Sequence, residues 1–302
     1  MRENKVTHIQ IPSISIGLGG IMLMWLTVGF SVPLVNILHD FPAEQLLFIR
    51  GFVTIIVLLP WLLRERLAVS RKNVLLALSF GLASIGLFAG TRIWGPNPTI
   101  IVFSASPILN VLFARWRGRR IGIPPIAAFI TLFLGIIVML QPWAVQGEFH
   151  LSGLLWSLFG MTMNAVFQEI LGQSSNASPL SRSLWQSFGC IAVGGLSILW
   201  VPWLWAIAEG HQVWSLIGFG LLSGVLNLRS NTLAFDHLPT AVASILAAGA
   251  APATIIISNW LLHTTLSVAQ WGGVALAMAS VAYLSAWLGK KSFGTKGVAV
   301  QD

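Results

Sequence analysis

The chain has 302 residues, of which 56% are hydrophobic and only 9% are charged, and its mean hydropathy is +0.82. This composition excludes a water-soluble domain and predicts a protein embedded in a lipid bilayer. A net charge of +8 would also suit a nucleic-acid partner, so the positions of the basic residues decide what that charge means. The single cysteine, Cys190, excludes a disulfide framework within the chain.

Ten apolar segments of about 20 residues follow one another, each long enough to cross a hydrocarbon core of ~30 Å. The first is too long for a signal-peptide core and lacks a small-x-small cleavage site, so we expect it to be retained. We therefore predict an all-α membrane protein with ten transmembrane helices. Their expected ranges are 14–35, 43–63, 73–94, 97–116, 121–143, 151–171, 183–203, 213–235, 239–262 and 266–288.

Lysine and arginine fall almost entirely in alternate loops. They precede the first segment, follow the tenth, and join segments 2 to 3, 4 to 5 and 6 to 7, where Arg182 is the joining residue. The loops at 39–43, 146–150 and 209–212 contain neither residue type. By the positive-inside rule, both termini are cytoplasmic. The basic charge then reports membrane topology, and we expect no nucleic-acid partner.

The second half of the sequence repeats the first. LSFGLASIG at 78–86 matches IGFGLLSGV at 217–225, and each half later places a proline, Pro107 or Pro252, inside an apolar segment. Because each half has five segments, an odd number, the second repeat crosses the membrane in the opposite direction. Inverted repeats are typical of carriers whose substrate site lies where the repeats meet. Since a proline removes a helical hydrogen bond, we predict bends at Pro107 and Pro252 that act as hinges.

These observations predict the organisation of the chain. A cytoplasmic N-terminus (1–13) precedes the first five-helix repeat (14–143), and an external linker (144–150) leads to the second repeat (151–288) and a cytoplasmic tail (289–302).

Several of these features together resemble the EamA branch of the drug/metabolite transporter superfamily. They are the two inverted halves of five helices, the arginine in LLFIRGF early in the second segment, and the repeated order of small residues, proline and closing apolar helix. The resemblance spans residues 14–288. It implies an exporter of amino acids, aromatic ones among them, in a prokaryotic inner (plasma) membrane. It also implies a central cavity surrounded by helices 1 to 4 and 6 to 9, with helices 5 and 10 outside.

One family feature is missing. A Gly-Glu pair is common between the fourth and fifth helices of each half, but this chain has Gly118-Arg119 and His263-Thr264 there. No role of that glutamate is carried over.

Polar residues within the segments are the candidates for substrate binding, because an unpaired polar group in hydrocarbon is costly. The sixth segment places Trp156, Asn164 and Gln168 on one face, since they are spaced at multiples of four residues. The eighth does the same with Asn227 and Asn231. These side chains either line a cavity or make interhelical hydrogen bonds of ~0.6 kcal/mol each, and both interpretations stay open.

Arg50 lies about 10 Å into the second segment at 1.5 Å per residue. It is a candidate to hold a substrate carboxylate, while pairing with Glu44 or with helix-end carbonyls is the alternative. Trp25 and Trp185 lie within their segments rather than at the ends. Together with Trp156 they could offer ring faces to an apolar or aromatic substrate.

The other charged residues of the segments have simpler explanations. We expect Arg92 to snorkel to a nearby membrane interface, and Arg229 either to snorkel or to pair with Asp236. No Asp or Glu lies in the middle third of a segment, which disfavours proton-coupled export of cations.

Motif searches exclude other classes. The sequence has no phosphate-binding loop, no histidine pair with metal-ligand spacing and no clustered catalytic set, so we expect no enzyme, cofactor or metal. We predict a secondary transporter that exports amino acids with large apolar or aromatic side chains by alternating access. A carrier of other small organic anions or drugs, or a channel-like facilitator, is the alternative. A stripe of small residues in the tenth segment could pack within the bundle or form a homodimer; it consists of Ala275, Ala279, Ala282 and Ala286.

Overall fold

The structure is a computed structural model of the whole chain. It describes residues 11–62, 67, 69–118, 122–140, 150–173, 178–199, 210–261 and 267–294. Most of the predicted N-terminal segment, most of the predicted linker and the end of the predicted tail lie outside the described residues, at 1–10, 141–149 and 295–302.

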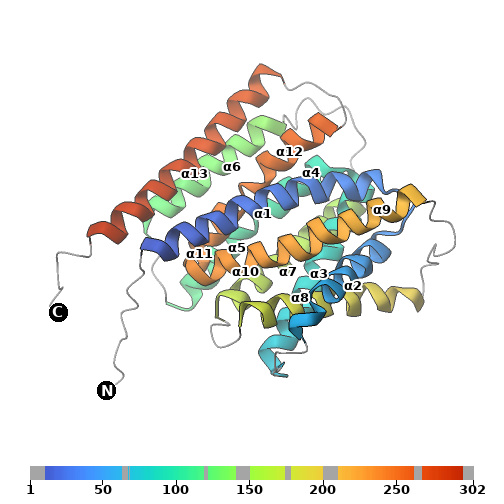
Figure 1. Cartoon of the computed structure of the whole chain (residues 1–302). Helices are drawn as coiled ribbons and strands as arrows, with labels where there is room; N and C mark the ends of the chain where they lie inside the picture. The colour runs from blue at the N-terminus through green and yellow to red at the C-terminus, as the bar shows by residue number, and fades with distance from the viewer. Residues whose placement is uncertain are drawn as a thin grey trace.

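Within the described residues the chain is helical and contains no strand, which confirms the predicted all-α class (Figure 1). The elements are α1 (Ile11–Ile37), α2 (Ala43–Leu62), α3 (Arg71–Trp94), α4 (Pro96–Ser104), α5 (Ser106–Trp116), α6 (Ile123–Leu140), α7 (Leu151–Gln173), α8 (Pro179–Leu196), the 3-10 turn η1 (Ser197–Leu199), α9 (Gly210–Phe219), the π-helical segment η2 (Gly220–Leu226), α10 (Asn227–His237), α11 (Thr240–Ala247), α12 (Ala250–Leu261) and α13 (Val268–Gly294).

Four of the ten predicted segments are each built from consecutive elements: α4 with α5, α8 with η1, α9 with η2 and α10, and α11 with α12. Seven helical stretches of the described part are long and apolar enough to cross a membrane. In α6 and α13 the apolar stretches are shorter, at Ile123–Val138 and Val268–Leu284. The eighteen residues of α8 include Arg182 and several serine and glutamine residues, which lower its hydropathy.

Local sequence explains where the helices end. The Ser70 hydroxyl accepts a hydrogen bond from the Asn73 amide (3.2 Å) and caps α3, and the Ser178 hydroxyl does the same for α8 through the Ser181 amide (3.0 Å). Gly95 is the one residue between α3 and α4. Its φ of +96° lies in the left-handed region that glycine adopts without strain, so the chain turns sharply there.

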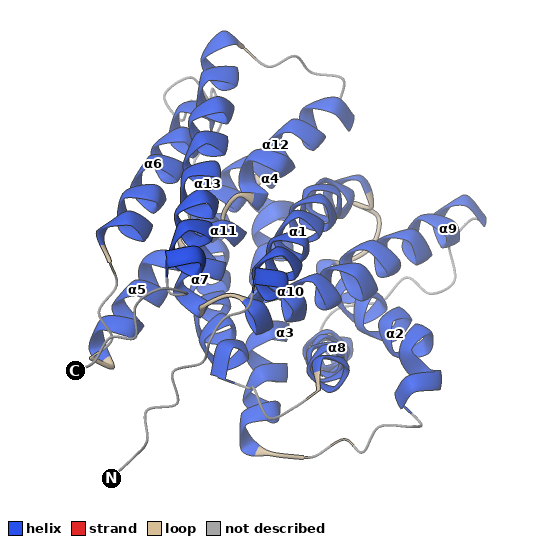
Figure 2. Ribbon diagram, turned by 60° about the vertical axis from the view of Figure 1, so that its left-hand side comes forward, coloured by secondary structure: helices blue, strands red, loops and turns tan. Residues whose placement is uncertain are grey.

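The two halves of the sequence interleave. Helix α3 packs against α7 and α8, and α1 packs against α10 and α12, so each half completes its packing on the other. Backbones approach closely where glycines meet: a Cβ on Gly86 would lie 2.5 Å from the Gly160 Cα atom of α7. Helices α6 and α13 form a separate pair at one side of the bundle (Figures 1 and 2).

The α6–α13 contact does not use the alanine stripe predicted from the sequence. Gly135 of α6 lies against the backbone of α13 at Gly273 and Ala277, and the Ser280 hydroxyl donates a hydrogen bond to the Ala128 carbonyl. The stripe residues all lie on the exposed face of α13 instead. The buried residues Gly273, Ala277, Ser280 and Leu284 each lie two positions before a stripe residue, about 200° around the helix, so the stripe is on the side of α13 that faces away from α6.

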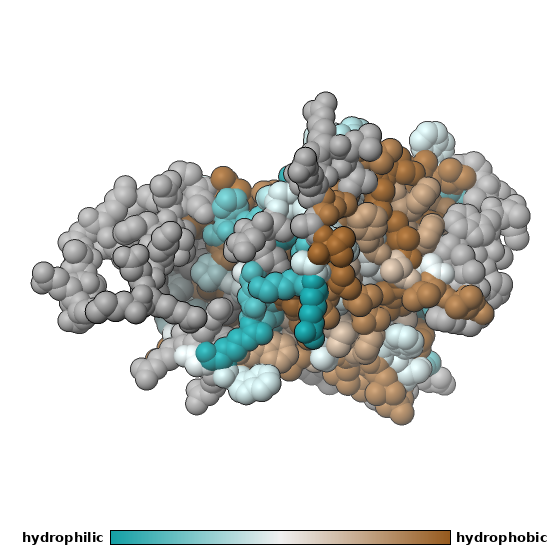
Figure 3. Space-filling view, turned by 90° about the horizontal axis from the view of Figure 1, so that it is seen from below, coloured by the Kyte–Doolittle hydropathy of each residue, from teal (hydrophilic) through white to brown (hydrophobic). Residues whose placement is uncertain are grey.

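Large apolar side chains cover much of the outer surface, among them Met22 (63% exposed), Leu26 (55%) and Ile56 (53%). Seen from below, a broad hydrophobic area lies beside a smaller hydrophilic patch (Figure 3). An exterior of this kind suits lipid and would aggregate in water.

Candidate functional site

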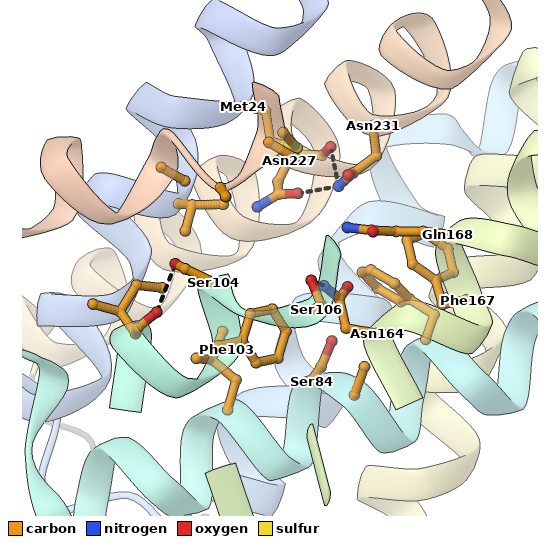
Figure 4. A pocket seen from close by; sticks show the side chains of 18 of the residues that line it. Met24, Ser84, Phe103, Ser104, Ser106, Asn164, Phe167, Gln168, Asn227 and Asn231 are labelled. Carbon is orange, nitrogen blue, oxygen red and sulfur yellow. Dashed lines mark hydrogen bonds between the residues drawn. The ribbon is translucent and has the colours of Figure 1, made fainter. Parts of the chain in front are cut away.

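A cavity of about 80 Å³ lies among the helices, and both sequence halves contribute to its wall (Figure 4). Residues of α1 to α5 line it from the first half, and residues of α7 and α10 to α12 from the second; none of its lining residues comes from α6, α8 or α13. Five of the eight predicted binding residues are part of the wall. They are Arg50, Asn164, Gln168, Asn227 and Asn231.

One wall is a polar seam where α4 and α5 run beside α7. Each of three side-chain hydrogen bonds joins residues separated by 58 positions, so the two helical segments run parallel and in register. The seam therefore combines the two roles that the sequence left open, since Asn164 and Gln168 make interhelical bonds and also face the cavity. The bonds are Ser157 Oγ to Thr99 Oγ1 (3.4 Å), Asn164 Nδ2 to Ser106 Oγ (3.1 Å) and Asn110 Nδ2 to Gln168 Oε1 (2.6 Å).

Opposite the seam, Asn227 and Asn231 form a pair at the start of α10. The Asn231 Nδ2 group donates to the Asn227 side-chain oxygen (2.5 Å) and to its carbonyl (3.0 Å). The pair follows the π-helical segment η2, a helix form that often occurs at functional sites. Within η2, Gly224 packs directly on the Arg50 carbonyl and the Thr54 hydroxyl of α2, which brings α10 close to the cavity.

Arg50 is buried in the cavity wall, with only 4% of its surface exposed. Its Nη1 group donates to the Ser84 hydroxyl (3.2 Å), and its guanidinium carbon lies 4.8 Å from the Phe80 ring centroid and 5.9 Å from that of Phe88. Its Nε group has no hydrogen-bond partner among the described residues. Neither predicted alternative is found, since within the described part Arg50 pairs with neither Glu44 nor a helix-end carbonyl.

Both predicted proline bends coincide with breaks in the helices. The break between α4 and α5 falls at Ala105, two residues before Pro107, and the break between α11 and α12 falls just before Pro252. Residues flanking both breaks line the cavity. The structure thus places the two breaks at the site, and the hinge role of the prolines stays a prediction.

Trp25 does not line the cavity. Its indole nitrogen donates a hydrogen bond to the Leu246 carbonyl (2.8 Å) at the end of α11, and its ring packs against Gly249 in the break. The sequence suggested a stacking face because Trp25 is far from the ends of α1. Its surroundings make it a cap for the broken helix.

The other two predicted tryptophans also lie outside the cavity wall. Trp156 is 39% exposed and contacts the edge of Phe159 on the outside of α7. Trp185 is half-buried on α8 and contacts Phe188. A spacing of four residues predicts one straight stripe, but 3.6 residues per turn rotate that stripe by about 40° each turn. Trp156 therefore drifts away from the face that carries Asn164 and Gln168.

The aromatic surface of the site comes from phenylalanines that the sequence analysis did not select: Phe80, Phe103 and Phe167. The rings of Phe80 and Phe167 are in contact, with centroids 4.7 Å apart. A signal for Phe80 did exist in the sequence, because it belongs to the motif at 78–86 together with Ser84, one turn further along α3. Phe103 and Phe167 stand next to Ser104 and Gln168 in the sequence, but neither belongs to the matched motif.

Three other arginines have structural partners. Arg182 is buried in the first turn of α8 and pairs with Asp236 of α10, so it is not a loop residue, and Asp236 does not pair with Arg229. At the ends of α5 and α7, Arg117 pairs with Glu169. Arg92 donates to the carbonyls of Leu38 (2.5 Å), His39 (2.6 Å) and Phe41 after the end of α1.

The chain is similar to known proteins over nearly its whole length. A curated relative, the riboflavin transporter of Vibrio cholerae serotype O1, is 23% identical over 317 residues, which cover 92% of this chain and 96% of the relative. Together with the apolar helices, this similarity supports an integral membrane protein that transports small metabolites. A protein of known crystal structure shares the fold, with a TM-score of 0.71 and 18% identity over 93% of this chain and 98% of the other. No family model matches the chain.

Proposed function

We propose that the chain is a secondary transporter that carries a small metabolite with a planar ring through the cavity by alternating access. The observation that carries the proposal is the composition of the wall, where amides and hydroxyls from both halves surround three phenylalanine rings. The cavity volume, about 80 Å³, is below the ~300–1,000 Å³ of most small-molecule sites. A state that binds substrate must therefore be wider, and the two helix breaks on the wall are suited to open it.

Flavins are the first substrate class to test, because the relative that matches most of the chain is a riboflavin transporter. The amides of Asn164, Gln168, Asn227 and Asn231 can each donate and accept, which suits the alternating donors and acceptors on a ring edge. Amino acids with aromatic side chains are the second class. Buried Arg50, which has no carboxylate partner in the described part, favours them.

Counterflow in proteoliposomes tests the proposal. Vesicles loaded with unlabelled riboflavin or tryptophan should accumulate the labelled compound from outside, with a saturable rate and inhibition by the excess compound. Flux that rises linearly with concentration would indicate a channel-like facilitator. Flux equal to that of protein-free vesicles for both compounds would refute both substrate classes.

The cavity itself is tested by a matched pair of variants on α7. Asn164→Leu removes an amide from the wall, and one neutral hydrogen bond is worth about 0.5–1.5 kcal/mol, so apparent affinity should fall roughly 2- to 10-fold. Thr162→Val is the control, because its hydroxyl bonds the Leu158 carbonyl of its own helix (2.9 Å) and Thr162 does not line the cavity. Equal effects of the two changes would place the substrate elsewhere.

We further propose that residues 14–143 and 151–288 are inverted repeats of the EamA branch, in a prokaryotic inner membrane with both termini cytoplasmic. In support, α1 begins and α13 ends on the same side of the bundle (Figure 1). The test uses Val268 (90% exposed, start of α13) and Trp116 (87% exposed, end of α5), in a background without Cys190. In intact cells an impermeant thiol reagent should label Val268→Cys and leave Trp116→Cys unlabelled; the reverse pattern would invert the orientation.

A further inference from the structure

The charge at Arg50 is not balanced by the protein. An arginine keeps its proton in practice, so the buried group is a permanent cation. Its contacts are two phenylalanine rings and one serine hydroxyl, which offset only part of the cost of taking a cation out of water. The lining of the cavity contains no aspartate or glutamate.

The acidic residues of the described part lie elsewhere. Glu169 pairs with Arg117 and Asp236 pairs with Arg182. Asp40 and Glu44 follow the end of α1 and lie close enough to Arg92 for their negative charges to attract its guanidinium. None of them forms an ion pair with Arg50.

Arg92 shows what a structural arginine looks like in this protein. Its two Nη groups donate to three carbonyls of the turn that follows α1, of which that of Leu38 also accepts a backbone hydrogen bond from the Phe41 amide. The Nε group has no hydrogen-bond partner in either arginine among the described residues, but the Nη groups of Arg50 have only one partner there, a hydroxyl, where those of Arg92 have three carbonyls. A purely structural role would leave most of its five donors unused.

Helix ends of both polarities face the cavity. The break between α4 and α5 places the N-terminus of α5 on the wall at Ser106, and the break between α11 and α12 places the N-terminus of α12 there at Ala250. Helix N-termini carry partial positive charge and favour anions. The same breaks bring the C-terminal ends of α4 at Ser104 and of α11 at Ala247 to the wall, and these ends carry partial negative charge. The helix ends therefore add no net charge, and Arg50 is the one ionised side chain among the lining residues.

We propose that Arg50 forms an anion subsite of this cavity and that the carried metabolite bears an acid group, a carboxylate or a phosphate, beside its ring. Arg50 would hold the acid group, with Ser84 fixing one side of the guanidinium, while the amides and phenylalanines hold the ring. This inference rests on the proposed function and narrows its substrate class from ring compounds in general to ring-bearing anions and zwitterions.

The experiment measures binding to the purified protein in detergent by titration calorimetry, so that it does not depend on transport. The probes are riboflavin with its 5′-phosphate, and tryptophanamide with tryptophan, two pairs that differ in the acid group. The wild type should bind the acid-bearing member of a pair at least about tenfold more tightly, as expected for one charge-assisted hydrogen bond. Arg50→Gln should abolish that preference and Arg50→Lys should retain part of it. Ile56→Leu, a lipid-facing change on the same helix, should leave it intact.

Equal binding of both members by the wild type, or a preference that persists in Arg50→Gln, would overturn the proposal. Repeating the titrations at low ionic strength without chloride distinguishes the source of the anion. A neutral probe that binds only with chloride present would overturn the acid-group assignment and make the partner an inorganic anion. Absence of flux in vesicles with the binding preference intact would count against the carrier function alone.

Thermal unfolding supplies a readout that needs no ligand. Because the protein leaves the Arg50 charge uncompensated, Arg50→Gln should melt no lower than the wild type. A fall of several degrees, as expected for a structural ion, would assign Arg50 to the fold and refute the subsite.

Discussion

The ion pair between Arg182 and Asp236 permits a quantitative test of the fold. Its two side chains are 4% and 15% exposed, and it joins the first turn of α8 to the end of α10. Removing one partner of a buried pair leaves an uncompensated charge and costs about 3–5 kcal/mol. Because Asp236 keeps some contact with solvent, we expect the lower end, about 3 kcal/mol, for Arg182→Met.

The measurement is thermal unfolding in detergent, followed by tryptophan fluorescence. A loss of 1 kcal/mol lowers the melting temperature by about 2–4 °C in chains of 150–250 residues, so Arg182→Met should melt roughly 6–12 °C below the wild type. The double variant Arg182→Met with Asp236→Leu should recover most of this loss, since neither charge is then left alone.

Arg117→Met is the comparison variant. Arg117 is 46% exposed, and its partner Glu169, although only 7% exposed, also accepts a hydrogen bond from Gln173 (2.6 Å). The Gln173 hydrogen bond remains in this variant and compensates part of the Glu169 charge, so its melting temperature should fall by less than that of Arg182→Met. The reasoning fails if Arg182→Met and Arg117→Met shift the melting temperature equally, or if the double variant is less stable than Arg182→Met alone.

Three further predictions follow from packing and from the helix breaks. Gly189→Ala should lower the melting temperature by several degrees, because its methyl group would overlap the Ala77 carbonyl of α3, whereas Gly218→Ala, with open space around it, should leave it unchanged. Pro107→Ala and Pro252→Ala should fold normally but slow counterflow, and unchanged rates in both would show that the breaks are packing features. Trp25→Phe removes the hydrogen bond to the end of α11, so it should cost about 1 kcal/mol of stability and weaken the binding of all substrates to the same extent. A selective loss of binding of aromatic substrates would contradict this prediction.

Features with a strong local signal could be predicted from the sequence. The length of the apolar segments predicted the helices, and the two prolines predicted the breaks beside the cavity, because both effects act within a few residues. Amides are so costly in hydrocarbon that they must face another helix, so Asn164, Gln168 and Asn227 were found. A tryptophan within a segment gives no comparable indication of which neighbour its ring faces. Trp25 and Trp185 could face any neighbour, and only the packing of distant helices decided that neither faces the cavity.

The partner of a charge also could not be predicted from the sequence. Arg182 was assigned to a loop because it lies at the start of an apolar segment, and its pairing with Asp236, 54 positions away, depends on how α8 and α10 meet. For Arg50 the sequence offered the nearby Glu44 as a partner. The structure turns Arg50 toward α3 instead, because α2 packs its backbone against Gly224 and presents its side chains to Ser84 and Phe80.

The glycine contacts of α3 bear on how the protein is made. Gly81 and Gly86 lie against backbone atoms of α8 and α7, helices that the ribosome synthesises about a hundred residues later. During synthesis the close-packing face of α3 must therefore be exposed to lipid until α7 and α8 are made. The helices of residues 14–143 have no complete core of their own. The bundle closes only when α7 and α8 enter the membrane. Cutting the gene between codons 143 and 151 should accordingly give two fragments that are each degraded when made alone and that restore one transporter when made together.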